Sequence, residues 1–258
     1  MMEVLAAGAA ELGFALDSSH LAQFEHYYRE LIAWNQRFNL TAVTDYVQVQ
    51  RRHFWDSLTC MLAFPNRSGG AVPNQLPVQL PGGPLHCADV GSGAGFPGIP
   101  LAILMSDVQF TLIESIGKKV TFLEHIVRTL ALDNVTVLGA RAEELGHDPR
   151  HREHYDVVLA RAVAALSALA EYCLPLCRVG GRMIAPKGAD VEAEITEAAF
   201  AVEVLGGTIV CNKPITVDQE ERRLVVIDKI AHTPERYPRN TGVPTKRPLR
   251  APSPPPTE

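Results

Sequence analysis

The 258-residue sequence predicts an α/β fold: a seven-stranded, mostly parallel sheet behind a helical N-terminal extension. From residue 85 onward, strand-like and helix-like segments alternate, which is typical of a parallel sheet with helices on both faces. The last two strand-like segments are joined by a short polar stretch around residues 218–221. Because this stretch has no room for a crossover helix, we expect these two strands to be antiparallel to each other.

The N-terminal extension comprises residues 1–64. Leu21, Phe24, Tyr28 and Leu31 recur at helical spacing within residues 19–35, and Ser18 or Ser19 is expected to cap that helix. A second helix is expected over residues 45–64. Nine proline and glycine residues within residues 65–84 then predict a linker or an exposed loop.

The expected domain spans residues 85–230. Its strands are predicted at 85–90, 109–114, 134–138, 155–160, 181–186, 207–212 and 222–229, and its helices near 98–106, 116–130, 164–176 and 190–204. The tail, residues 231–258, is rich in proline and carries five basic residues against two acidic ones. It is expected either to be an extended arm that follows an RNA backbone or to be solvated and without a role.

Composition narrows the class of protein. The apolar content of 47% is enough for a full core, and the net charge of −5 argues against nucleic-acid binding over the whole surface, though not against a local basic patch. Five scattered cysteines favour reduced thiols and a cytoplasmic location, and Cys173 and Cys177 lack the partners that a metal site needs. No apolar stretch is long enough for a membrane span, and we expect a monomer.

The strongest local signal is a glycine-rich turn after the first strand. It contains Asp89, Gly91 and Gly93, in a G-x-G-x-G spacing. Glycine allows the backbone to turn tightly and to approach a ligand closely. A dinucleotide enzyme would show G-x-G-x-x-G, and an acid beside a pyrophosphate would repel it. S-adenosylmethionine has a sulfonium and no phosphate, so Asp89 and the spacing favour it over NAD.

Three further positions extend the predicted cofactor site. Glu114 ends the next strand, where an acid accepts hydrogen bonds from ribose hydroxyls. Ala142 and Glu143 follow the third strand, in the loop that borders the adenine in this fold. Arg161 follows the fourth strand and is expected to contact the cofactor, an RNA phosphate or an internal acid. The order of these elements predicts the Rossmann-like fold of class I S-adenosylmethionine-dependent methyltransferases.

Several longer motifs run through nearly the whole chain. They are Trp34-Asn35, Phe38-Asn39-Leu40-Thr41, Arg52-His53-Phe54-Trp55-Asp56-Ser57-Leu58, Phe96-Pro97-Gly98, Arg141-Ala142-Glu143, Ala160-Arg161-Ala162, Lys187-Gly188, Arg236-Tyr237-Pro238-Arg239 and Gly242-Val243-Pro244. With these motifs the chain resembles the bacterial 16S rRNA guanine-N7 methyltransferase G family, also called the glucose-inhibited division protein B family. The chain departs from the family at Pro186, where leucine is usual, and in the length of the 65–84 segment.

The resemblance implies methylation of one guanine in the 530 loop of 16S rRNA, presented as rRNA or as the small ribosomal subunit. It also implies cofactor contacts from Gly91, Phe96, Ala142, Glu143 and Arg161. Guanine N7 carries no proton, so we expect positioning residues and no general base. Candidates for handling the substrate are Asn39, His53, Asp56, Arg141, Arg161 and Lys187.

Individual roles are expected for some of these residues. Asp56 is expected to accept hydrogen bonds from the guanine N1–H and amino groups, or else to brace the N-terminal helices together with His53. Lys187 and Arg161 are expected to hold phosphates. Phe96 is expected either to line the pocket of the methyl donor or to serve packing alone.

Three other functions stay open at this point. The first is an S-adenosylmethionine-dependent methyltransferase that acts on a small molecule, a protein or another RNA. The second is an NAD-binding oxidoreductase. The third is a ribosome-assembly binder without enzymatic activity. The first alternative shares the cofactor site but would not need the basic tail.

Overall fold

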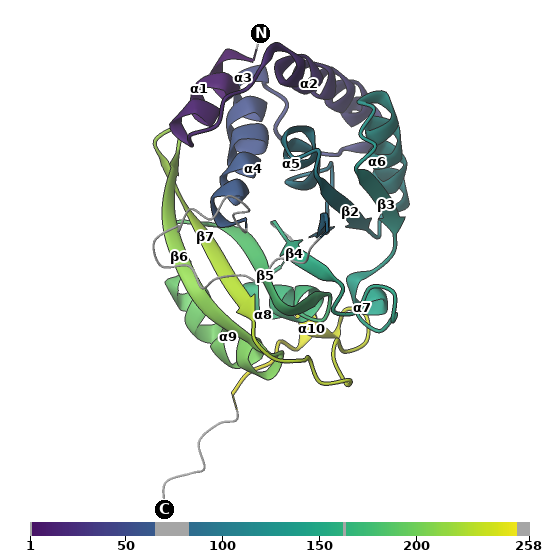
Figure 1. Ribbon diagram of the computed structural model, residues 1–258, viewed down its shortest axis with the longest axis vertical. Helices are drawn as coiled ribbons and strands as arrows, with labels where there is room; N and C mark the ends of the chain where they lie inside the picture. The colour runs from purple at the N-terminus through teal and green to yellow at the C-terminus, as the bar shows by residue number, and fades with distance from the viewer. Residues whose placement is uncertain (1, 65–82, 162–163, 252–258) are drawn as a thin grey trace, which may run out of the picture.

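The computed structural model describes residues 2–64, 83–161 and 164–251. Most of the predicted 65–84 loop and the last seven residues of the tail therefore lie outside the described residues. Within the described part, a seven-stranded sheet crosses the middle of the molecule, and helices cover both of its faces (Figure 1).

The strand order is β3-β2-β1-β4-β5-β7-β6, and β7 is antiparallel to both of its neighbours. The predicted antiparallel hairpin and the predicted mostly parallel sheet are confirmed. From β1 the chain adds β2 and β3 on one side and β4 and β5 on the other, and at such a switch point α/β proteins bind ligands at the carboxyl ends of the strands. The strands are β1 (Leu85–Val90), β2 (Val108–Glu114), β3 (Val135–Gly139), β4 (Tyr155–Leu159), β5 (Cys177–Gly188), β6 (Gly207–Val217) and β7 (Glu220–Lys229).

Alternate side chains of each strand enter separate cores on the two faces of the sheet, as the two-residue period of a strand requires. Cys87 and Val157 face the first core, whereas the neighbouring Ala88 and Val158 face the second. The N-terminal helices, α5 (Gly98–Leu104) and α6 (Gly117–Thr129) pack on the first core. The second core takes α7 (Ala142–Leu145), α8 (Leu166–Cys173) and α9 (Glu192–Val204).

The N-terminal extension is helical, as predicted, but it is divided into more segments. The α2 helix begins with a capping box in which Asp17 accepts a hydrogen bond from the His20 N–H, so the cap is Asp17 rather than Ser18 or Ser19. The helix ends at Asn39, whose φ of +50° is left-handed. The segments are α1 (Glu3–Glu11), α2 (Ser18–Phe38), α3 (Tyr46–Val49), a π-helical segment (Gln50–Trp55), α4 (Asp56–Leu58) and a 3₁₀ segment (Thr59–Ala63).

The C-terminal segment, residues 231–251, packs against the domain. Tyr237 and Pro244 are buried, and the segment contains a short helix, α10 (Val243–Lys246), that lies against α8. Over these residues the prediction of an extended arm is therefore wrong. Buried prolines and a tyrosine inside the tail make contacts that charge composition alone does not indicate.

No helix in the described ranges combines the length and the apolar character needed to cross a membrane.

Candidate functional site

The glycine-rich loop after β1 follows a backbone path that side chains disfavour. Gly91 and Gly93 have φ values of +72° and +61°, in the left-handed region. The Gly91 N–H donates to the Ile113 carbonyl over 2.8 Å, which ties the loop to the end of β2. At Gly95, an added Cβ would lie 2.6 Å from the Tyr27 hydroxyl of α2. The N-terminal helices thus press directly on this loop.

Asp89 lies beneath the loop and is fully buried. Its Oδ2 accepts a hydrogen bond of 2.9 Å from the Gly98 N–H at the start of α5, while Oδ1 has no partner among the described residues. Burial raises the pKa of Asp89 to about 7, against the opposing effects of the Gly98 N–H and the Arg161 charge. The carboxyl therefore acts first on the loop itself, and the unpaired oxygen is a buried acceptor beside it.

Glu114 lies at the end of β2, as expected, and its carboxylate joins two backbones. Oε2 accepts from the Gly93 N–H and Oε1 from the Ile116 N–H, each over 2.9 Å. Each oxygen keeps a lone pair for a further donor. Glu114 is thus both a brace for the loop and an acceptor on a cavity wall.

The first cavity, about 320 Å³, opens above the loop. Glu114 and Glu143 present carboxylates there, and Gly91 presents bare backbone. Arg141 lies exposed on this wall, and of the other candidates for handling the substrate only Arg161 also lines this cavity. The cavity is lined by Val90, Gly91, Ile113, Glu114, Ser115, Ile116, Lys119, Ala140, Arg141, Ala142, Glu143, Arg161 and Tyr172.

The residues of the first cavity fit S-adenosylmethionine. Two acceptor carboxylates in the wall, with the unpaired oxygen of Asp89 buried beneath the loop, match a ligand with hydroxyl, amino and sulfonium groups. The sequence did not single out Tyr172 and Lys119, because α8 and α6 approach the cavity only in the folded chain.

A second cavity of about 360 Å³ lies next to the first and shares Arg161 with it. It draws side chains from the π-helical segment, α4, the end of β4, β5 and β7. Of the predicted candidates for handling the substrate, the structure brings His53, Asp56, Arg161 and Lys187 together here. The cavity is lined by Arg52, His53, Asp56, Arg161, Pro186, Lys187, Gly188 and Arg222.

Asp56 is the acidic centre of the second cavity. Its Oδ2 lies 2.8 Å from Arg161 Nη1, and its Oδ1 lies 3.5 Å from Arg222 Nε. Arg222 also pairs with Glu220, which pairs in turn with Arg52 over 2.9 Å. Of the three expected partners of Arg161, the structure thus shows the internal acid. Arg52 and Arg222 were absent from the candidates, because nothing in the sequence places β7 beside the π-helical segment.

His53 lines the second cavity and is held by Thr41 of the N-terminal extension and by Phe96, which follows the glycine-rich turn. Its Nε2 lies 2.8 Å from Thr41 Oγ1, and its ring stacks on Phe96 with centroids 4.5 Å apart. Burial and the Arg161 charge lower the pKa of His53 to about 4. The ring is therefore neutral near pH 7. Asn35 fixes the same turn, because its Oδ1 accepts from the Thr41 N–H over 2.8 Å.

Lys187 keeps its expected place near the end of β5 despite the preceding proline. Pro186 and Lys187 stand opposite Leu224 and Arg223 in the ladder with β7, with no break in register. The Lys187 ammonium is bound by Glu194 at 2.8 Å and by the Ala164 carbonyl at 3.1 Å. The shorter of these two contacts is therefore with the carboxylate of Glu194 in α9.

Phe96 and Asn39 do not line either cavity. Phe96 packs between the loop and the N-terminal helices, with the Arg161 guanidinium carbon 5.2 Å from its ring centroid. The structure therefore shows the packing contacts considered for Phe96. Asn39 is exposed and ends α2. Its neighbours Asn35 and Thr41, rather than Asn39, connect that turn to His53.

The described part of the chain holds no cluster of three or more potential metal-binding side chains. Its five cysteines are free thiols, of which Cys173 and Cys177 are buried at the end of α8 and the start of β5. Burial raises the pKa of both thiols.

The strand order, the glycine-rich loop and the acid ending β2 together define a class I S-adenosylmethionine-dependent methyltransferase. The family model described as rRNA small subunit methyltransferase G matches residues 20–225, and the chain belongs to this family.

Close relatives carry the same name. Ribosomal RNA small subunit methyltransferase G of Roseiflexus sp. (strain RS-1) is 50% identical over 96% of this chain and 100% of its own length. The protein of Roseiflexus castenholzii is 49% identical over the same shares, and that of Lactobacillus johnsonii is 41% identical over 96% of this chain and 99% of its own length.

Proposed function

We propose that the protein transfers the methyl group of S-adenosylmethionine to N7 of a guanine in the 530 loop of 16S rRNA. One observation carries this proposal: a cavity with an acid ringed by three arginines adjoins the cofactor cavity and shares Arg161 with it. The names of the relatives supply the substrate, small-subunit rRNA.

The cofactor is proposed to bind in the first cavity. Gly91 offers close backbone approach, and Glu114 offers acceptors for the ribose hydroxyls. Ala142 and Glu143 border the base, while Asp89 supports the loop from below. When bound, S-adenosylmethionine supplies an electrophilic methyl group on a sulfonium.

The guanine is proposed to enter the second cavity. The Asp56 carboxylate fits the N1–H and amino edge of guanine, and reading that edge leaves N7 on the opposite side of the base. Arg52, Arg222 and Lys187 lie around it and fit phosphates of the same RNA segment. In this structure Lys187 pairs with Glu194, and Arg52 and Arg222 pair with Glu220. An RNA phosphate that displaces one of these carboxylates would replace one anionic partner of the cation with another.

Rate acceleration is proposed to come from alignment. Guanine N7 has a lone pair and no proton, so no side chain has to remove one. His53, held neutral and stacked on Phe96, stiffens the wall of the second cavity. Holding two reactants in line can supply roughly 7–11 kcal/mol of the barrier.

Mass mapping of 7-methylguanosine tests the proposal. Small subunits and free 16S rRNA from a strain that lacks this methyltransferase are incubated with the protein and S-adenosylmethionine. We expect one new 7-methylguanosine in the 530 loop. Methylation at another position, or only of a protein or small molecule, would overturn the substrate assignment.

We further propose that the protein works as a monomer in the cytoplasm. One chain supplies both the cofactor cavity and the guanine cavity. Free buried thiols suit a reducing compartment. Sedimentation analysis of the purified protein at micromolar concentration tests the monomer. A stable dimer would contradict it.

A further inference from the structure

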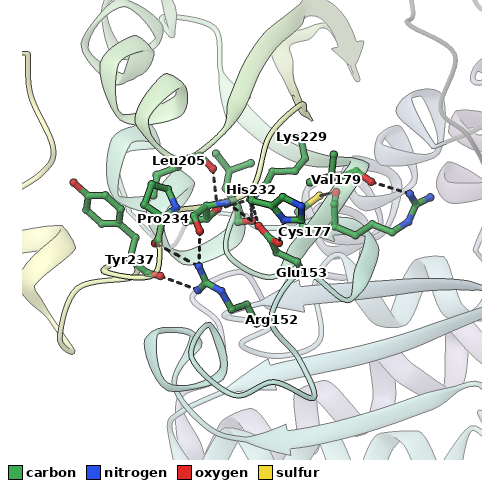
Figure 2. A network of polar contacts seen from close by, with 12 residues as sticks. Arg152, Glu153, Cys177, Val179, Leu205, Lys229, His232, Pro234 and Tyr237 are labelled. Atoms are coloured by element: carbon green, nitrogen blue, oxygen red, sulfur yellow. Dashed lines mark hydrogen bonds and ion pairs between the residues drawn. The ribbon is translucent and has the colours of Figure 1, made fainter.

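The C-terminal segment reaches the wall of the cofactor cavity after a well-anchored path. Figure 2 shows the first anchor, where Arg152 donates to the carbonyls of Thr233 and Tyr237 over 2.6 and 2.8 Å. Glu153 accepts from the Thr233 N–H and pairs with the buried Lys229. These contacts fix where the segment leaves β7.

A second anchor lies on α8. The Arg239 guanidinium binds the Glu171 carboxylate through two parallel hydrogen bonds of 2.8 and 2.6 Å. Glu171 is fully buried and the Arg239 side chain is 25% exposed, so this bidentate pair is largely shielded from solvent. The residue after Glu171 is Tyr172, which lines the cofactor cavity. The anchor therefore brings the segment next to that cavity.

Beyond this anchor, the segment forms hydrogen bonds with the polar groups of two side chains that line the cofactor cavity. The Gly242 N–H donates to Glu143 Oε1 over 3.0 Å, and Thr245 Oγ1 lies 2.7 Å from the Tyr172 hydroxyl. Glu143 and Tyr172 come from α7 and α8, and both line the first cavity. Without the segment, the Glu143 and Tyr172 side chains would each lack this hydrogen bond, which limits their rotamers.

We propose that Gly242 and Thr245 are positioning residues for the cofactor: the docked C-terminal segment holds Glu143 and Tyr172 in the conformation that binds S-adenosylmethionine. A side chain ordered before binding costs no conformational entropy when the ligand arrives. The segment thus sets cofactor affinity without touching the methyl group or the RNA. The proposal rests on the cofactor assignment and is independent of which RNA is methylated.

Thr245→Val in the full-length protein is the main test. It keeps the shape of the side chain and removes the hydroxyl that bonds Tyr172. We expect the Kd of S-adenosylhomocysteine, measured by calorimetry without RNA, to rise about three- to tenfold, the effect of one hydrogen bond. The KM for S-adenosylmethionine should rise equally, while kcat at saturating cofactor stays within about twofold. Thr245→Ser should restore the wild-type Kd.

Two further variants separate positioning from general stability. Gly242→Ala meets no atom within 4 Å, but it strains a backbone with φ of +77° and so displaces the N–H that bonds Glu143. It should also raise the Kd. Tyr28→Phe is the matched control, because its hydroxyl bonds the Thr44 carbonyl in the N-terminal extension. Its Kd should equal that of the wild type.

A double-mutant cycle closes the test. Thr245→Val and Tyr172→Phe should each raise the Kd of S-adenosylhomocysteine. The Kd of the double variant should not exceed the higher of the two single-variant values, because both changes remove the same hydrogen bond. If Thr245→Val leaves the Kd unchanged, or if Thr245→Ser does not restore it, the proposal is wrong. If the wild type itself does not bind S-adenosylhomocysteine, the cofactor assignment fails instead.

Discussion

The Arg161 guanidinium and the Asp56 carboxylate lie 2.8 Å apart at the junction of the two cavities. Arg161 follows β4 and Asp56 starts α4, and the pair joins the catalytic sheet to the N-terminal extension. Both side chains are largely shielded from solvent, so the removal of either would leave the other poorly paired. The pair therefore connects the predicted cofactor site with the predicted guanine site.

Asp56→Asn is expected to lower kcat/KM for 16S rRNA by roughly 10- to 100-fold, equivalent to about 1.4–2.7 kcal/mol. The amide retains an acceptor oxygen but loses the charge that orients Arg161 and Arg222. The Kd of S-adenosylhomocysteine should change by less than about twofold. Asp148→Asn, which breaks the 2.6 Å pair with Arg150 on the surface, is the control and should leave turnover unchanged. Loss of cofactor affinity in Asp56→Asn would instead mean that this residue also acts on the cofactor cavity through Arg161.

Arg222→Gln and Arg52→Gln are expected to weaken rRNA binding and to reduce its salt dependence. Each lost phosphate contact should lower the slope of log K against log salt by about one. Binding is measured by filter retention at several salt concentrations. Arg29→Gln removes an arginine that pairs with Glu25 on the surface of α2 and should keep the wild-type slope. An unchanged slope in Arg222→Gln would mean that this arginine does not bind phosphate.

His53 is expected to make the protein less stable in mild acid. Its pKa falls from 6.5 to about 4 on folding because of burial and the Arg161 charge. Between these values the unfolded chain binds a proton that the folded chain does not, so stability is complete above about pH 6.5 and is lost as the pH falls toward 4. From pH 7 to pH 5 the loss would be at most about 2 kcal/mol.

Urea unfolding at pH 7 and pH 5 measures this loss. His53→Gln should reduce the difference between the two pH values, while His26→Gln, a change on the exposed side of α2, should not. Equal pH dependence in the wild type and His53→Gln would show that the folded ring titrates normally.

Gly91→Asp is expected to weaken S-adenosylhomocysteine binding at least about 100-fold. Gly91 has a φ of +72° and lines the cavity, so a side chain there is both strained and in the ligand's way. Calorimetry gives the affinity, and circular dichroism checks the fold. Gly13→Asp is a matched control, because Gly13 has a φ of +86° with open space around it. Retained turnover in Gly91→Asp would refute the role of the loop.

The local chemistry of the cofactor site was predictable from the sequence. Gly91 and Glu114 follow successive strands, and the alternation of elements fixes both at the carboxyl edge of the sheet. Hydrophobic periodicity and glycine spacing are local properties, and for that reason they gave the fold class and the parallel order. The strand ends were less accurate: β6 and β7 extend to a tight turn at Asp218 and Gln219, since pairing between them lengthens both.

Tertiary structure alone decided which distant side chains meet. Arg52 and Arg222 lie far apart in the chain, yet both line the cavity around Asp56. The C-terminal segment likewise bonds Glu143 instead of extending into solvent. Such contacts depend on how whole elements pack, and packing is set by complementary surfaces from several parts of the chain. The sequence by itself determined the ligand-binding loop and its acid, while the folded core decided which cations surround the substrate cavity and what holds the cofactor cavity in shape.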